Sequence, residues 1–180
     1  MYLSTSYIKM IFLGLLLLIS SCGDSQNRAR RTKRKPLTLD ETIEMNKIQV
    51  GNEQALITAF VEENGLKMQR TETGLWYHIS NDSKEIPVVT DKVVILDYEV
   101  SLLDGTVCYS SDCTGYKEFL VGKGGVESGL EEGILMLRKG SEATFILPSH
   151  LAHGLMGDDD KIPSRAILKY EVKVIDIKDK

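Results

Sequence analysis

The chain has 180 residues, enough for one domain of ordinary size with extensions. Hydrophobic residues make up 42% and charged residues 27%, a composition typical of a folded protein. The formal net charge is −4, but 7 of the 22 cations and only 1 of the 26 acids precede residue 36, so the remainder has 15 cations against 25 acids, or −10. We therefore expect no nucleic acid as a partner, because phosphate binding needs a positive face.

Residues 1–21 have the pattern of an export signal. Lys9 precedes an apolar run at 10–19, which is too short to span a membrane easily. The run leads through two serines into Cys22, and this junction resembles the lipobox of bacterial lipoproteins, in which the cysteine is diacylated and becomes the mature N-terminus. The resemblance implies a lipoprotein signal peptide, lipidation of Cys22, and a cell-envelope location, anchored to the membrane and facing the periplasm. An ordinary cleaved signal with a chance cysteine is the alternative.

Residues 22–36 are expected to be the lipidated cysteine followed by a flexible tether. The segment contains six cations and, after the cysteine, Ala29 is its single apolar residue before Pro36, a composition typical of disorder. The cations either lie on anionic lipid headgroups or belong to a solvated spacer without specific contacts.

Residues 37–65 are expected to form a helical extension. Asn64-Gly65 is a good stop signal, and Gly51 leaves open whether the segment is one helix or two. Apolar residues with partial helical spacing are Leu39, Ile43, Leu56, Ala59 and Phe60. The extension either packs on its own domain or forms a dimerising arm. We expect packing on its own domain, and a monomer in preference to a homodimer.

From Gly65 onward the apolar residues recur with a period of two, which predicts β-strands. Asp104-Gly105 is a hairpin turn signal, and residues 148–165 form a long loop whose acidic run, 158–160, we expect to be a solvated tip. Strands are expected around 75–79, 94–102, 106–110, 116–121, 143–147 and 166–177.

One short helix is expected among these strands, after a glycine-rich turn. Ser128 and Glu131 have the spacing of a capping box, and Leu130, Ile134 and Leu137 share one helical face. Such a short helix is unstable alone and must be buried. We therefore predict an α+β domain over 66–180, in which a strongly curved antiparallel sheet wraps around the helix.

Eight motifs in register resemble the FKBP-type peptidyl-prolyl isomerases over roughly residues 91–180. They are Tyr98 with Leu103–Val107, Ser110-Ser111, Val121–Lys123, Val126, Gly129–Gly133, Leu147-Pro148, Ala152–Gly154 and Ile162-Pro163. Together with the lipobox, residues 126–130 and 148–154 look most like the gliding-motility-associated FKBP-type lipoproteins.

The resemblance implies a proline-binding pocket between sheet and helix, with no metal or cofactor. The backbone N–H of Glu127 matches the group that binds a substrate carbonyl. Tyr109 stands where an aspartate is usual, Cys108 where a phenylalanine is usual, and His153 where a tyrosine hydroxyl bonds substrate carbonyls, a bond that an imidazole N–H can also donate. The residues at matching wall positions are Tyr98, Phe119, Val126, Leu130, Ile162 and Tyr170.

The implied function is peptidyl-prolyl cis-trans isomerisation that assists the folding of exported proteins through their proline-containing segments, in the service of gliding motility. The alternative is a chaperone or assembly lipoprotein with the same fold and weak or no isomerase activity. Each wall residue also suits simple core packing. Cys108 and Cys113 either form a disulfide or remain free thiols.

Overall fold

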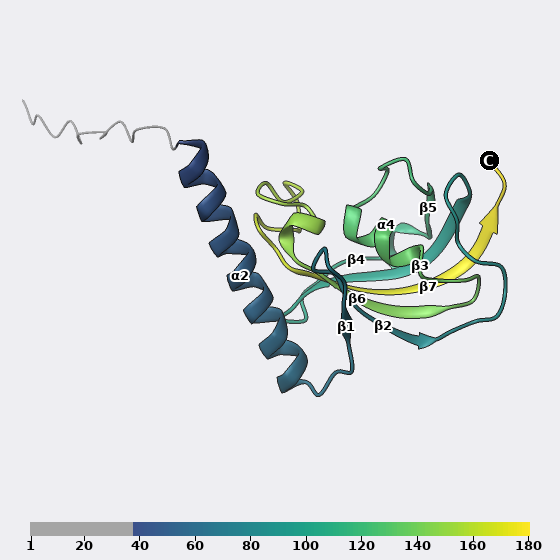
Figure 1. Cartoon of the computed structure of the whole chain (residues 1–180). Helices are drawn as coiled ribbons and strands as arrows, with labels where there is room; N and C mark the ends of the chain where they lie inside the picture. Colours follow the sequence, from purple (N-terminus) through teal and green to yellow (C-terminus); the bar gives the residue numbers. More distant parts are fainter. Residues whose placement is uncertain (1–37) are drawn as a thin grey trace, which may run out of the picture. The chain divides into compact units, whose positions relative to one another are not determined.

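The computed structural model describes residues 38–180, so the predicted signal peptide, Cys22 and the tether lie outside the described residues (Figure 1). The elements in chain order are α2 (Leu39–Glu63), β1 (Gln69–Arg70), β2 (Trp76–Asn81), β3 (Val93–Leu102), β4 (Val107–Ser110), α3 (Ser111–Thr114), β5 (Lys117–Leu120), α4 (Ser128–Ile134), β6 (Glu142–Leu147), η1 (Ser149–Leu151) and β7 (Leu168–Lys178). The expected strands are all present, and α3 is an additional single turn that the sequence did not indicate.

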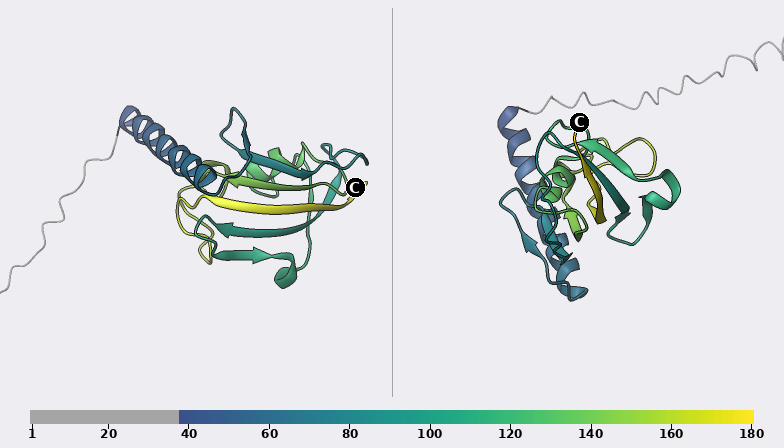
Figure 2. Two further views of the ribbon diagram at one scale, coloured as in Figure 1. Left: turned by 90° about the horizontal axis from the view of Figure 1, so that it is seen from below. Right: turned by 90° about the vertical axis from the view of Figure 1, so that its right-hand side faces the viewer.

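The strands form one antiparallel sheet with the order β1-β2-β6-β7-β3-β4, and β5 also pairs with β3. The two longest strands, β3 and β7, pair along their whole lengths, from Val93 opposite Lys178 to Leu102 opposite Leu168. Their register shifts once, between Ile95 and Leu96, and such bulges increase the local twist of a sheet. Figure 2 shows this sheet curving around α4.

Helix α4 supplies the centre of the main core. Leu130, Ile134 and Leu137 are buried, as their shared helical face predicted. The curved antiparallel sheet wrapped around one short helix is therefore confirmed, and so is the α+β class.

The start of α4 differs from the prediction. Its N-cap is Glu127, whose side chain makes no capping bond, and the helix ends at Ile134, before Leu137. The Glu131 carboxylate instead accepts the backbone N–H groups of Gly122, Lys123 and Gly124, at 2.6, 3.1 and 3.3 Å. Glu131 thus holds the glycine-rich turn closed, because this turn offers three unpaired N–H groups to one carboxylate oxygen.

Helix α2 is one continuous helix of 25 residues, so Gly51 does not divide it. It begins with a capping box between Thr38 and Glu41. Its buried residues, Glu53, Ile57 and Val61, all lie in the C-terminal half. Ile57 and Val61 pack with Ile146 of β6 in a second, smaller core. The expected packing of the extension on its own domain is therefore seen for this half.

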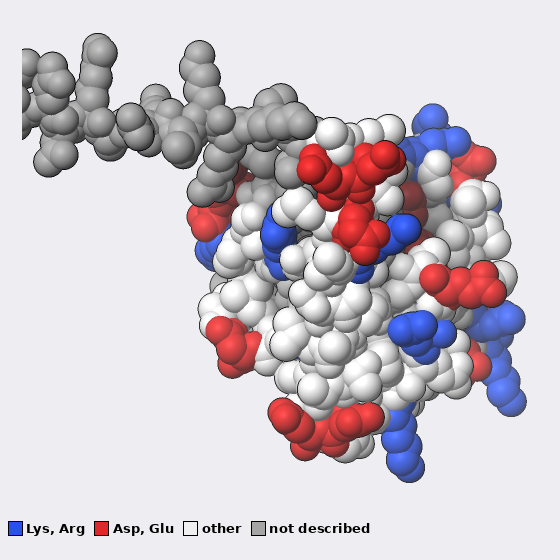
Figure 3. Space-filling model, turned by 60° about the vertical axis from the view of Figure 1, so that its left-hand side comes forward, with Lys and Arg blue, Asp and Glu red and all other residues white. Residues whose placement is uncertain are grey.

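In the other half of α2 every residue except the half-buried Gln49 is exposed, including the apolar residues. Leu39, Ile43, Met45 and Ile48 all belong to the exposed large hydrophobic residues. Figure 3 shows one face of the molecule, with a broad uncharged area between acidic groups near its upper and lower ends. Among residues 38–180, no helix is both long and apolar enough to cross a membrane.

Two glycine substitutions with opposite expected effects test this packing. A Cβ at Gly133 would lie 2.7 Å from the Phe145 ring, so we expect Gly133→Ala to lower the free energy of unfolding by about 1–3 kcal/mol. A Cβ at Gly51 would meet no atom within 4 Å, so we expect Gly51→Ala to raise it by about 0.5–1 kcal/mol. Urea unfolding measures both, and equal effects of the two substitutions would contradict the tight contact of α4 with β6.

Candidate active site

A cavity of about 270 Å³ opens where β3, β4, β5 and β7 face the start of α4 and the loop after η1. We call it the central cavity. Five of the nine residues predicted for the site line it together: Tyr98, Tyr109, Glu127, His153 and Tyr170. The remaining lining residues are Val100, Lys117 and Asp158.

The other four predicted residues lie outside the central cavity. Val126 lines a neighbouring hollow that shares Lys117, Glu127 and His153 with it. Phe119, Leu130 and Ile162 are buried in the main core, where they pack beneath the site. The structure therefore brings six of the nine predicted residues to two adjoining hollows and places the other three in the core.

Lys117 is a cavity residue that the sequence reasoning missed. Its ammonium lies 5.2 Å from the ring centre of Tyr98 and 5.9 Å from that of Tyr170, within range of cation–π attraction. Side chains two apart on a strand point to the same face, so the inward position of Phe119 was itself the signal that Lys117 also points inward.

The Glu127 side chain lies at the centre of the site with only 9% of it exposed. Its Oε1 accepts the Tyr170 hydroxyl at 2.7 Å and the His153 Nε2–H at 2.9 Å. Its Oε2 has no hydrogen-bond partner, and the Lys117 ammonium is 3.8 Å from it. The sequence analysis assigned a role only to the backbone N–H of Glu127. In the structure its carboxylate also binds two of the polar groups that surround the cavity.

Charge and hydrogen bonds keep Glu127 ionised despite burial. Burial alone raises the pKa of this carboxyl, but the Lys117 charge, backbone and Tyr170 hydrogen bonds and His153 together hold the pKa below its ordinary value. Burial and the adjacent Glu127 carboxylate raise the pKa of Tyr170, so its hydroxyl remains a donor. Because Glu127 is ionised, Nε2 of His153 carries the proton in their hydrogen bond.

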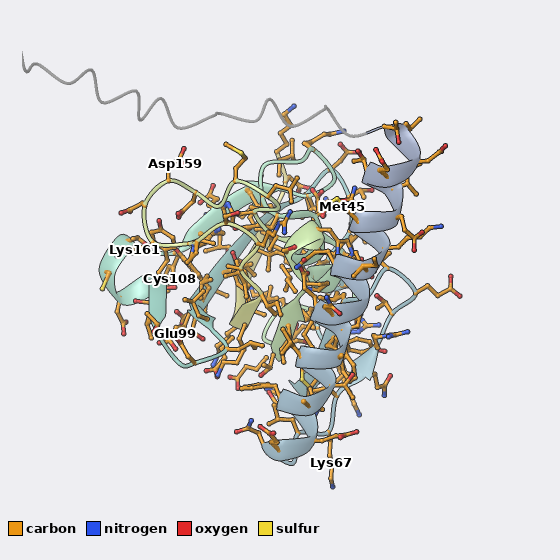
Figure 4. The ribbon with its side chains drawn as sticks, turned by 90° about the vertical axis from the view of Figure 1, so that its left-hand side faces the viewer. Met45, Lys67, Glu99, Cys108, Asp159 and Lys161 are labelled. Carbon is orange, nitrogen blue, oxygen red and sulfur yellow. The ribbon has the colours of Figure 1, made fainter. Side chains whose placement is uncertain are left out.

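Asp158 closes the cavity on the opposite side and is not part of a solvated loop tip, contrary to expectation. It accepts the backbone N–H of Asp160 at 3.0 Å, that of Ile162 at 2.7 Å, and the Tyr109 hydroxyl. The Tyr109 hydroxyl, helped by these N–H groups against burial, lowers the pKa of Asp158 to about 2. Asp159 and Asp160, the other two residues of the acidic run, are exposed as expected, and Figure 4 shows Asp159 on the loop.

Tyr109 is held from a second side by the same loop. The Lys161 ammonium lies 5.1 Å from the centre of the Tyr109 ring. Beside it, Cys108 is buried, with its sulfur 3.7 Å from the Lys161 carbonyl oxygen (Figure 4). Cys108 and the exposed Cys113 are free thiols, and burial raises the pKa of Cys108.

The central cavity combines aromatic walls with charged groups. Tyr98, Tyr109 and Tyr170 provide flat apolar surfaces, whereas Lys117, Glu127 and Asp158 carry charge. The resemblance implied a proline-binding pocket walled by aromatic and aliphatic residues. This chain instead has room for a small ring between tyrosines, beside polar groups that are mostly paired with one another.

A larger hollow of about 340 Å³ lies over polar side chains of the sheet and offers a different surface. Its lining includes the carboxylates of Asp97, Glu99, Asp112, Glu142 and Glu171. Of the three tyrosines that line the central cavity, only Tyr98 also lines this hollow. We therefore assign the candidate site to the central cavity.

Residues 84–175 match the family model of the FKBP-type peptidyl-prolyl cis-trans isomerases. The chain is 38% identical over 122 residues to the probable FKBP-type peptidyl-prolyl cis-trans isomerase FkpA of Neisseria meningitidis serogroup B, covering 66% of this chain and 44% of that protein. It is 35% identical over 122 residues to the FKBP-type 22 kDa peptidyl-prolyl cis-trans isomerase of Escherichia coli, covering 66% of this chain and 58% of the relative. The chain thus spans about half the length of these relatives.

Solved structures show the same fold. The crystal structure of FkpA from Escherichia coli superposes with a TM-score of 0.63 at 22% identity, covering 98% of this chain and 74% of that chain. AtFKBP13 superposes with a TM-score of 0.58 at 24% identity, covering 61% of this chain and 98% of its own.

The hydrogen bond between Tyr109 and Asp158 predicts a specific pH dependence. The pKa of Asp158 is lowered from 3.8 to about 2, so its contribution to stability is present above pH 4 and is lost as the pH falls from 4 to 2. We expect Tyr109→Phe to destabilise the domain at pH 7 and to have little effect at pH 2. Thermal unfolding across this range measures it, with Tyr116→Phe, on an exposed tyrosine, as the control. Parallel curves for Tyr109→Phe and the parent would contradict this assignment.

Proposed function

Because this chain belongs to the FKBP-type peptidyl-prolyl cis-trans isomerases, we propose that it isomerises X–Pro bonds in exported proteins and so assists their folding. The observation that carries the proposal is the central cavity, where Tyr98, Tyr109 and Tyr170 meet Glu127 and His153 at the place that the family resemblance implies for the site. Proline-containing segments of exported clients are the proposed partners.

The chemistry requires a cavity that prefers a twisted amide to a planar one. Rotation about an X–Pro bond loses C–N resonance, with a barrier of about 18–20 kcal/mol, and takes tens to hundreds of seconds unaided. The planar amide carries more charge on its carbonyl oxygen and is more strongly hydrated. Tyrosine walls that grip the proline ring and displace its water therefore favour the twisted form, and each 1.36 kcal/mol of preference gives about tenfold in rate.

The polar groups of the cavity bear on the second candidate function, a chaperone or assembly factor with weak isomerase activity. The Glu127 carboxylate already occupies the His153 N–H, the donor proposed for a substrate carbonyl, and the Tyr170 hydroxyl. A substrate carbonyl must compete with this carboxylate, and the charge of Glu127 and Lys117 favours retained water. Both effects reduce the preference for a twisted amide, so they favour the second candidate.

One set of variants tests the activity and separates the two candidates. We expect the full chain in detergent to accelerate cis-to-trans isomerisation of a proline peptide in a protease-coupled assay. Tyr98→Ala, which removes a wall, should lower kcat/KM at least about tenfold, and Tyr116→Ala should leave it unchanged. Glu127→Leu, which removes the competing carboxylate, should raise it.

If neither the parent chain nor Glu127→Leu accelerates isomerisation, but the parent chain suppresses aggregation of an unfolded client, the isomerase proposal is wrong and the chaperone function is supported. Acceleration that Tyr98→Ala leaves intact would place the reaction outside the central cavity.

The proposed location is the cell envelope, with the domain held at a membrane through acyl chains on Cys22 and facing the periplasm. The lipobox-like junction at Cys22 and the apolar run before it support this anchor. The similarity of residues 126–130 and 148–154 to gliding-motility lipoproteins supports service in that machinery, which loss of colony spreading in a deletion strain would test.

A cysteine substitution tests the anchor. We expect the parent chain to sediment with membranes and Cys22→Ser to appear in the soluble envelope fraction, because the variant cannot be acylated. Equal distribution of the two proteins between the membrane and soluble fractions would contradict the lipid anchor.

A further inference from the structure

A carboxylate of α2 is buried where the helix meets the loop of the candidate site. Glu53 is only 2% exposed. Its Oε2 accepts the backbone N–H of Ser149 at 2.8 Å, and its Oε1 accepts the Ser149 hydroxyl at 2.7 Å and the Gln49 side-chain amide at 2.8 Å. Within residues 38–180, no lysine or arginine forms an ion pair with it. A buried charge without a cation is costly, so three donors on one carboxylate indicate a specific attachment.

The residue that Glu53 binds is the one that shapes the loop around His153. Ser149 begins η1, and its carbonyl oxygen accepts the N–H of Ala152 at 3.1 Å and that of Gly154 at 2.8 Å. These two N–H groups flank His153 on either side in the sequence. The position of Ser149 therefore determines where the backbone of His153 lies.

The same turn is fixed against α4. Leu151 is buried, and its Cβ is 3.0 Å from the position that a Cβ of Gly129 would take. The Ser128 hydroxyl lies 3.5 Å from the Leu151 carbonyl oxygen. Glu53 thus attaches α2 to a turn that connects directly with α4 and with His153, a wall of the central cavity.

Contacts of the residues that follow Glu53 in α2 fix the helix on the domain and so fix the position of Glu53 relative to the turn. Gln54 accepts the indole N–H of Trp76 at 3.0 Å and donates to the Gly74 carbonyl oxygen at 3.2 Å. Ile57, one helical turn further on, is fully buried against the sheet. Because Gln54 and Ile57 hold the helix directly after Glu53, the carboxylate has a fixed position relative to the turn.

We propose that Glu53 is a positioning residue for the candidate site. It holds Ser149, Ser149 holds the two N–H groups around His153, and His153 is thereby kept in reach of Glu127 and of a bound peptide. Helix α2 is then a structural part of the site and not only an extension before the domain. The catalytic consequence rests on the proposed isomerase function, whereas the ordering of the turn does not.

Hydrogen exchange and activity of the full chain in detergent micelles test this role together. In Glu53→Gln, one of the two acceptor oxygens becomes an amide nitrogen, so one of the two Ser149 donors loses its acceptor and the charge is removed. Exchange of peptides covering Ala152–Gly154 should accelerate at least about tenfold, the ratio expected when a hydrogen bond to a charged group is lost. Peptides from β7 should keep their protection, and kcat/KM should fall about tenfold through displacement of His153. Ser149→Ala, which keeps the N–H and loses only the hydroxyl, should give a smaller change of the same kind.

The matched control is Glu62→Gln, on an exposed glutamate of the same helix, which should change neither exchange nor activity. Glu53→Gln and Ser149→Ala would overturn the proposal if they lowered protection everywhere equally, because Glu53 would then be a general stability contact. Local loss of protection with unchanged kcat/KM would overturn it as well. If the parent chain were inactive but the turn still exchanged faster in Glu53→Gln, the isomerase function would fail while the ordering of the turn by Glu53 stood.

Discussion

The close approach of α4 to the sheet is the constraint on which the rest of the fold depends. Gly129 and Gly133 face Leu147 and Phe145, and a Cβ at either glycine would come within 2.7 Å of those side chains. Without side chains at these two positions the helix lies directly on β6, and Leu130 and Ile134 fill the core on either side. The start of α4, with Glu127, is thereby fixed at the end of the curved sheet where the central cavity opens.

Much of the fold was readable from local patterns, because strands and helices are specified by periodicity. The alternation along β3 and β7, the Asp104-Gly105 turn and the single helix at 128–134 all follow from neighbouring residues. The hydrogen-bond partners of a side chain were predicted wrongly where more than one set of backbone donors could reach it. The spacing of Ser128 and Glu131 predicted a capping box. The Glu131 carboxylate instead accepts three backbone N–H groups of the glycine-rich turn.

The site was predictable in outline and not in its chemistry. Tyr98 and Tyr170, which match wall positions of the family, line one cavity with Tyr109, which stands where an aspartate is usual. The charged residues of the cavity could not be predicted from the sequence, because an acidic or basic residue in a strand or loop normally faces solvent. Asp158 turns inward because Tyr109 and two backbone N–H groups bind it, and Lys117 turns inward with the strand. The bond between Glu53 and Ser149 joins residues 96 apart in the chain, a separation at which local pattern carries no information.

The distribution of buried residues along α2 has a consequence for how this helix melts. None of residues 39–52 is buried, whereas Glu53, Ile57 and Val61 are fixed to the domain. Local opening has a low free-energy cost where few apolar contacts are lost, so the first half of the helix can unwind while the second half remains folded. Gly51 lies at this boundary, and its weak helical propensity makes it a natural point for the unwinding to stop. Opening of the second half loses the buried contacts of Glu53, Ile57 and Val61 and therefore costs more free energy than opening of the first half.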